Sequence, residues 1–76
     1  MPEKRSFTAY IERDPETNLL VAFVPGLPGA HTQAESLDEL RTNLAEVIEL
    51  CLEDMTPENL AALPEFVGLQ QIEVAR

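Results

Sequence analysis

The sequence predicts an α+β domain in which one amphipathic helix covers one face of a small β-sheet. Three observations lead to this fold class. Two strand-like segments, residues 6–13 and 19–24, flank a polar segment that is rich in turn-forming residues. A short polar strand, residues 30–34, follows a Pro/Gly turn. Residues 36–53 then repeat apolar side chains at separations of three and four, which is the spacing of an amphipathic helix.

The first strand is predicted from strict alternation over residues 6–13. Its apolar members, which share one side of the strand, are Phe7, Ala9 and Ile11. Residues 14–18 have the composition and length of a hairpin connection, and Pro15 suits the second position of a type I turn. We therefore expect the second strand to return antiparallel to the first.

The second strand, residues 19–24, is apolar at every position, so both of its faces need cover. One helix covers only one side of a small sheet. The other side is a candidate contact with a second copy or another protein, and we assign to it the oligomer-interface residues Leu20, Ala22 and Val24. Alternatively, Tyr10 and long polar neighbours shield that side within the monomer.

The turn after the second strand reads Val24-Pro25-Gly26-Leu27-Pro28-Gly29. The prolines fix φ and the glycines permit positive φ, so neither helix nor sheet continues through it. This turn either sets the geometry between two strands or projects Leu27 into a partner. The edge strand that follows carries His31, read as a surface or interface residue rather than a catalytic base. The candidate partner-binding residues are Pro25, Gly26, Leu27, Pro28, Gly29 and His31.

The main helix is predicted to begin at Ser36, because Glu39 follows three residues later in a capping-box pattern. A second, short helix is expected after Thr56, with Pro57 at its first position and Pro64 after its end. Residues 69–75 read as a fourth strand. A right-handed crossover would place that strand beside the first, which gives a sheet order of 3-2-1-4.

The composition predicts an acidic surface. The chain has 14 Asp and Glu residues against 5 Lys and Arg residues, for a net charge of −9. Phosphate contacts need clustered cations, so we expect no direct nucleic-acid binding and instead favour a basic protein partner. Solubility alone is the other explanation for this charge.

Length bounds the organisation. With 76 residues, the chain (1–76) is expected to be a single domain. A chain of this size buries only roughly 60 to 70% of its unfolded surface, so self-association into a dimer or tetramer is expected to help stabilise it. No apolar run approaches the roughly 20 residues that span a bilayer, and no apolar leader is seen. We therefore predict a cytoplasmic protein without a membrane partner.

The residues that carry enzyme chemistry are scarce: the chain has one His, one Cys and one Tyr. Because Cys51 is the only cysteine, the chain cannot form an internal disulfide. Cys51 lies on the apolar side of the predicted helix. The carboxylates Glu12, Asp14 and Glu16 are read as a solvated turn rather than a cation site. We predict no enzyme activity, no cofactor and no metal site.

The ordered set of motifs over residues 7–53 resembles the amino-terminal domain of HicB-family antitoxins. The matching segments are Thr8-Ala9-Tyr10-Ile11-Glu12-Arg13-Asp14, the turn from Val24 to Gly29, Thr32, and Ser36-Leu37-Asp38-Glu39. The resemblance implies a partial ribonuclease-H-like fold without nuclease activity. It also implies a partner, because HicB proteins bind and neutralise HicA, a small basic ribonuclease toxin.

The resemblance is incomplete at the carboxyl end. Full-length HicB proteins usually add a DNA-binding domain there, and nothing after Asp54 is long or basic enough to be one, so we expect none. The predicted function is therefore an antitoxin-like protein that neutralises a HicA-type toxin. The alternative is a stand-alone HicB-like homo-oligomeric domain that binds a small ligand or an unrelated protein.

Overall fold

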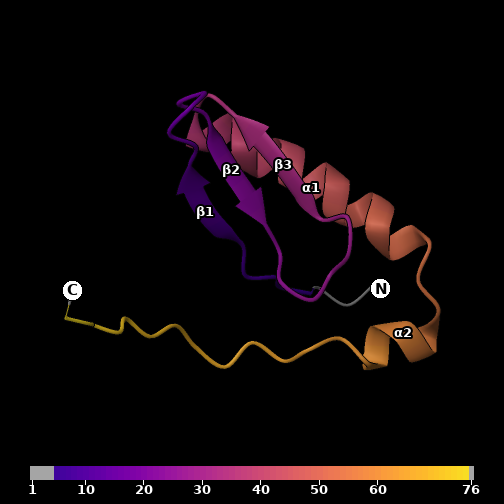
Figure 1. The fold of residues 1–76 in the computed structure, drawn as a ribbon. Helices are drawn as coiled ribbons and strands as arrows, with labels where there is room; N and C mark the ends of the chain where they lie inside the picture. Colours follow the sequence, from indigo (N-terminus) through magenta and orange to yellow (C-terminus); the bar gives the residue numbers. More distant parts are fainter. Residues whose placement is uncertain (1–4, 76) are drawn as a thin grey trace.

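The computed structural model describes residues 5–75 and confirms a small α+β fold with one main helix on one face of an antiparallel sheet (Figure 1). Its sheet has 3 strands in the order β1-β2-β3. The elements, in chain order, are β1 (Tyr10–Arg13), β2 (Leu20–Phe23), β3 (His31–Ala34), α1 (Leu37–Glu53) and α2 (Pro57–Ala61).

The hairpin between β1 and β2 forms where the turn residues predict it. The Asp14 carboxylate accepts a hydrogen bond from the Glu16 N–H at 2.9 Å, and the Asp14 carbonyl accepts from the Asn18 N–H at 2.8 Å. Asn18 has a φ of 63°, a left-handed conformation that Asn tolerates better than most residues. The turn fixes the register, so Arg13 lies opposite Leu20 and Tyr10 lies opposite Phe23.

β1 is shorter than the predicted 6–13, because its partner strand ends early. Continuing the register past Tyr10 and Phe23 would bring Thr8 opposite Pro25, which has no N–H to donate. On the β3 side pairing continues one residue further, where the Val24 N–H donates to the Ala30 carbonyl at 2.9 Å. The chain before Tyr10 therefore runs alongside the sheet without joining it.

Both helices begin at the predicted caps. The Ser36 side chain accepts a hydrogen bond from the Glu39 N–H at 3.2 Å, and the Thr56 side chain accepts from the Asn59 N–H at 3.1 Å. Each satisfies one of the unpaired N–H groups at a helix start. α2 ends at Ala61, before Pro64 as predicted, and none of its residues is buried.

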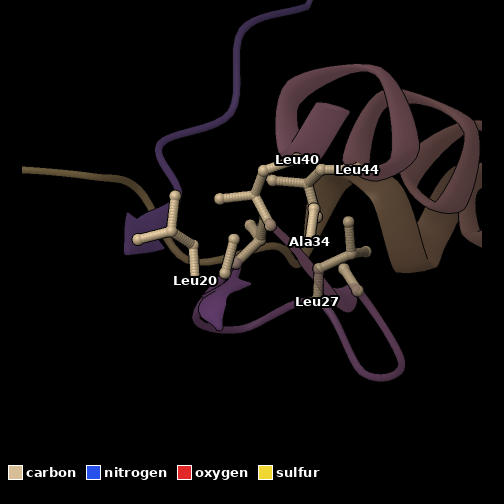
Figure 2. Packing of buried hydrophobic residues seen from close by; sticks show 8 residues of the cluster. Leu20, Leu27, Ala34, Leu40 and Leu44 are labelled. Carbon is tan, nitrogen blue, oxygen red and sulfur yellow. The ribbon is translucent and has the colours of Figure 1, made fainter. Parts of the chain in front are cut away.

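The core lies between α1 and one face of the sheet (Figure 2). Leu40 and Leu44 point from α1 toward the sheet and are 2% and 8% exposed. The buried residues are Leu20, Ala22, Val24, Leu27, Ala30, Ala34, Leu40 and Leu44.

This core corrects the predicted oligomer interface. Leu20, Ala22 and Val24 lie beneath α1 and are buried, so they are core residues of the protomer and not a surface for another copy. The other face of β2 is the open one. The physical reason is the hairpin register, which puts Ala22 opposite Ile11 and so on the apolar side of β1, where the helix packs.

The predicted fourth strand is not part of the sheet in residues 5–75. Residues 69–75 form no strand of this sheet, and within the described part of the chain β1 is paired with β2 alone. In Figure 1 this segment runs from α2 past the end of the sheet and away from it. Its apolar side chains find no second layer in the protomer, so nothing stabilises pairing with its own sheet.

Candidate protein-binding face

The sheet face opposite α1 carries a row of three ring side chains. Tyr10, Phe23 and His31 lie side by side on β1, β2 and β3, because Phe23 is in register with both of the others. The Tyr10 and Phe23 rings have centroids 5.4 Å apart and are tilted by 36°. Phe23 is 37% exposed and His31 is exposed, so the row presents apolar and hydrogen-bonding groups to solvent.

The neighbouring row on the same face consists of Glu12, Val21 and Gln33, which are again in register across the three strands. Glu12 and Gln33 are exposed and Val21 is half-buried. The face is therefore a mixed surface in which aromatic side chains are bordered by polar ones. Such a composition is typical of surfaces that bind another protein.

The Pro/Gly turn adjoins this face at the end that carries Phe23 and His31. The two residues and the turn between them line a shallow hollow of about 340 Å³. Gly26 and Gly29 have φ of 85° and 84°. Residues with a side chain rarely adopt such backbone angles, so the turn requires glycine at both positions. Leu27 N–H and Ala30 N–H donate to the carbonyls of Val24 and Leu27, which closes the turn on itself.

The turn is held from two sides. The Cys51 thiol of α1 donates to the Pro28 carbonyl at 3.5 Å. On the other side, Pro64 lies directly against Gly26: a Cβ at Gly26 would come within 2.6 Å of the Pro64 ring. The turn is therefore packed against both α1 and the chain that follows α2.

The predicted partner-binding residues divide in two. Pro25, Gly26, Pro28 and Gly29 are exposed, as is His31, and all of them line the hollow. Leu27 also lines it, but its side chain is only 4% exposed and belongs to the core beneath α1. Leu27 therefore sets the turn geometry, which was one of its two predicted roles, and does not project into a partner.

Sequence reasoning did not select Tyr10 and Phe23 as partner-binding residues, although they form the aromatic pair of this row. The signal that would have found them is the hairpin register. Once Asp14 to Asn18 are read as the turn, Tyr10 must face Phe23, and the polar side of β1 identifies the open face of β2.

The charge of the surface is strongly negative. α1 has Asp38 and Glu39 in its first turn and no basic residue in its last turn, which ends at Glu53. Its exposed acidic side chains are Asp38, Glu39, Glu46, Glu49 and Glu53. With a net charge of −9 over the whole chain, the long-range electrostatic field of the domain favours the approach of positive charges over negative ones.

Two further findings concern the part of the chain that the structure describes. Nowhere in residues 5–75 do three or more His, Cys, Asp or Glu side chains form a group arranged for a metal ion. Within the same residues, no helix combines the length and the apolar character that crossing a membrane requires.

Fold and surface together define a small acidic α+β domain in which, over residues 5–75, one sheet face is open and the outer edge of β1 has no partner strand. Its sequence is 51% identical over 71 residues to a UPF0150 protein of Thermotoga maritima, covering 93% of this chain and 92% of that protein. A UPF0150 protein of Synechocystis sp. is 42% identical over 93% of this chain and 97% of its own length. A UPF0150 protein of Archaeoglobus fulgidus is 48% identical over 90% of this chain and 93% of its own length.

The chain therefore belongs to the UPF0150 family. No protein-family model matches it, and no solved structure is significantly similar to it.

Proposed function

We propose that this protein is an antitoxin-like binder that neutralises a small basic ribonuclease of the HicA type. The observation that carries the proposal is the open sheet face, where the half-buried Tyr10 and the exposed Phe23 and His31 form a row on an otherwise acidic domain. A basic protein would be drawn to the acidic surface and would bury the rings on contact.

The resemblance to HicB supports the same proposal. The motifs that carry it fall on β1, the Pro/Gly turn, β3 and the start of α1, in the order that a partial ribonuclease-H-like arrangement would have. In this proposal the sheet order 3-2-1-4 is reached only when a fourth strand joins β1. The protein acts by covering its partner and catalyses nothing itself.

The proposal is tested with a purified HicA-type ribonuclease encoded in the same genome, preferably in the adjacent reading frame. Titration of the acidic domain should abolish cleavage of an RNA substrate at a fixed stoichiometry. Association should slow as salt rises, because the long-range attraction is screened. Absence of both binding and inhibition at low salt would refute the proposal.

The binding face is tested by Phe23→Ala. We expect affinity for the toxin to fall at least about tenfold, since aromatic residues at the centre of an interface carry much of its energy. Leu50→Ala is the matched control, because Leu50 is 62% exposed on α1, away from the open face. Circular dichroism of both variants checks that the fold is retained. If Leu50→Ala weakens binding and Phe23→Ala does not, the face is misassigned.

The alternative function is a homo-oligomeric interaction domain for a small ligand or an unrelated protein. The uncovered apolar side chains of residues 66–75 favour self-assembly, which this alternative includes. Self-assembly is also compatible with toxin binding, so the ribonuclease inhibition assay decides between the two functions.

A further inference from the structure

The carboxy-terminal segment, residues 65–75, leaves its large apolar side chains exposed to solvent. Its large side chains have exposed fractions of 91% for Val67, 70% for Leu69, 73% for Ile72 and 73% for Val74. The radius of gyration is 14.5 Å, whereas a compact domain of this length is expected to have about 11 Å. The difference agrees with Figure 1, in which this segment extends away from the body of the molecule.

An apolar groove, which could accept apolar side chains of this kind, lies between β1 and α1. It has a volume of about 990 Å³, and its apolar lining includes Phe7, Ala9, Ile11, Leu44, Ile48 and Leu52. Ile11 shows that no side chain or strand of the described residues covers this groove from the outer side of β1. It is 50% exposed at the outer edge of the sheet, while Ala22, its partner on the central strand, is 0% exposed beneath the same helix.

The outer edge of β1 also has unused hydrogen-bonding groups. Within residues 5–75, β1 pairs with β2 on one side and with no strand on the other. An exposed strand edge of this kind is a template for another strand. A strand added here would lie in the groove beneath α1 and would cover Ile11.

Residues 69–75 have the pattern that such a strand requires. Ile72 and Val74 share one face, which suits the groove, and Gln71 and Glu73 share the other, which suits solvent. Leu69 falls on the second face, so the polar side of the strand begins at Gln71. At about 3.3 Å per residue the segment spans about 23 Å, which is sufficient to pass the whole of β1.

We propose that residues 69–75 of one copy fill the groove of a second copy as a strand beside β1, and that the exchange is reciprocal. Each chain offers one segment and one groove, so a two-fold dimer uses both and leaves neither uncovered. The sheet order 3-2-1-4 is then completed between chains.

The direction of the segment favours the second copy over the same chain. Pro64 packs against Gly26, and residues 65–68 line a hollow together with Arg5 and Ser6 at the start of the sheet. From there the chain continues extended past β1 and contains no turn. Entering its own groove would require the segment to bend toward β1 after residue 68, whereas a neighbouring molecule is reached by continuing outward.

Cysteine cross-linking between different chains tests the exchange. In a Cys51→Ser background, a chain with Ile11→Cys is mixed with a longer, tagged chain that carries Ile72→Cys or Val74→Cys, and the mixture is oxidised. We expect a disulfide-linked product that contains both chains, identified by mass spectrometry. Glu73→Cys is the matched control and should cross-link several-fold less, because its side chain faces away from the groove.

A single chain carrying both Ile11→Cys and Ile72→Cys completes this test. A predominantly intrachain disulfide at micromolar concentration would overturn the proposal, because it would place the segment in its own groove. Failure of every mixed pair to cross-link would overturn it as well.

The oligomeric state gives a second, independent measurement by light scattering. The full chain should be a dimer, and Ile72→Asp with Val74→Asp should shift it to a monomer whose circular dichroism is unchanged, since neither residue is in the core. Gln71→Asp adds charge on the opposite face and should leave the dimer intact. A monomeric full chain, or a dimer that survives the double substitution, would refute the exchange. No toxin is involved, so this outcome is independent of the proposed function.

Discussion

The layer built from β2, β3 and α1 and the segment that follows α2 contain the same kinds of apolar residue but differ completely in burial. Leu40 on α1 is 2% exposed, whereas Leu69 in the carboxy-terminal segment is 70% exposed. The layer is covered because a helical stripe faces a sheet. The segment has strand-like alternation but lacks a second layer. Burial is therefore decided by the availability of a partner surface and not by hydrophobicity alone.

The largest expected effect that separates the two regions is loss of a core leucine. Leu40→Ala should lower the free energy of unfolding by about 2 to 5 kcal/mol, a large share of the about 4 to 11 kcal/mol expected for a domain of this size. Val67→Ala, at a position that is 91% exposed, is the matched control and should change it by less than about 0.5 kcal/mol. Urea denaturation measures both, and comparable losses would contradict the contrast.

The next effect concerns glycines. Gly26→Ala should destabilise the fold by about 1 to 2 kcal/mol or more, because φ is 85° there and the new methyl group meets Pro64. Gly68→Ala meets no atom within 4 Å and should be nearly neutral. Gly26→Ala in a Pro64→Ala background separates backbone strain from the clash. A neutral Gly26→Ala would show that the turn is not held as described.

The smallest effect concerns the two helix caps. Ser36→Ala should cost about 0.5 to 2 kcal/mol, because α1 contributes much of the core and loses a hydrogen bond to its first turn. Thr56→Ala removes a similar bond but should cost less, since α2 buries no residue. Ser36→Asn keeps a capping oxygen and serves as the control. An equal loss at the two caps would mean that α2 is as well supported as α1.

Local features of the chain could be predicted from the sequence. Ser36 and Thr56 cap helices, and Asp14 closes the hairpin, because each depends on hydrogen bonds within a few residues. The start of β1 was less predictable: Phe7 and Ala9 alternate correctly, yet pairing stops because Pro25 ends the partner strand. Local periodicity does not report what the neighbouring strand can accept.

Features that depend on packing between distant segments were harder to predict. Every position of β2 is apolar, so alternation alone did not show which face meets α1, and Ala22 was assigned to the open side. The hollow next to Phe23 and His31 was partly predicted, through the Pro/Gly turn. Residues 69–75 were predicted to pair with the first strand, yet they form no strand of the sheet. Alternation shows that a segment can pair, but it does not specify which strand edge lies within its reach.

The contact between Gly26 and Pro64 joins the open face to the carboxy-terminal segment. Gly26 belongs to the turn beside the open face, and Pro64 is the point from which the carboxy-terminal segment departs. The two surfaces therefore meet at this contact. A molecule seated on the turn lies next to the point at which the segment leaves, so a binding partner and an exchanged segment have to share the space around Pro64.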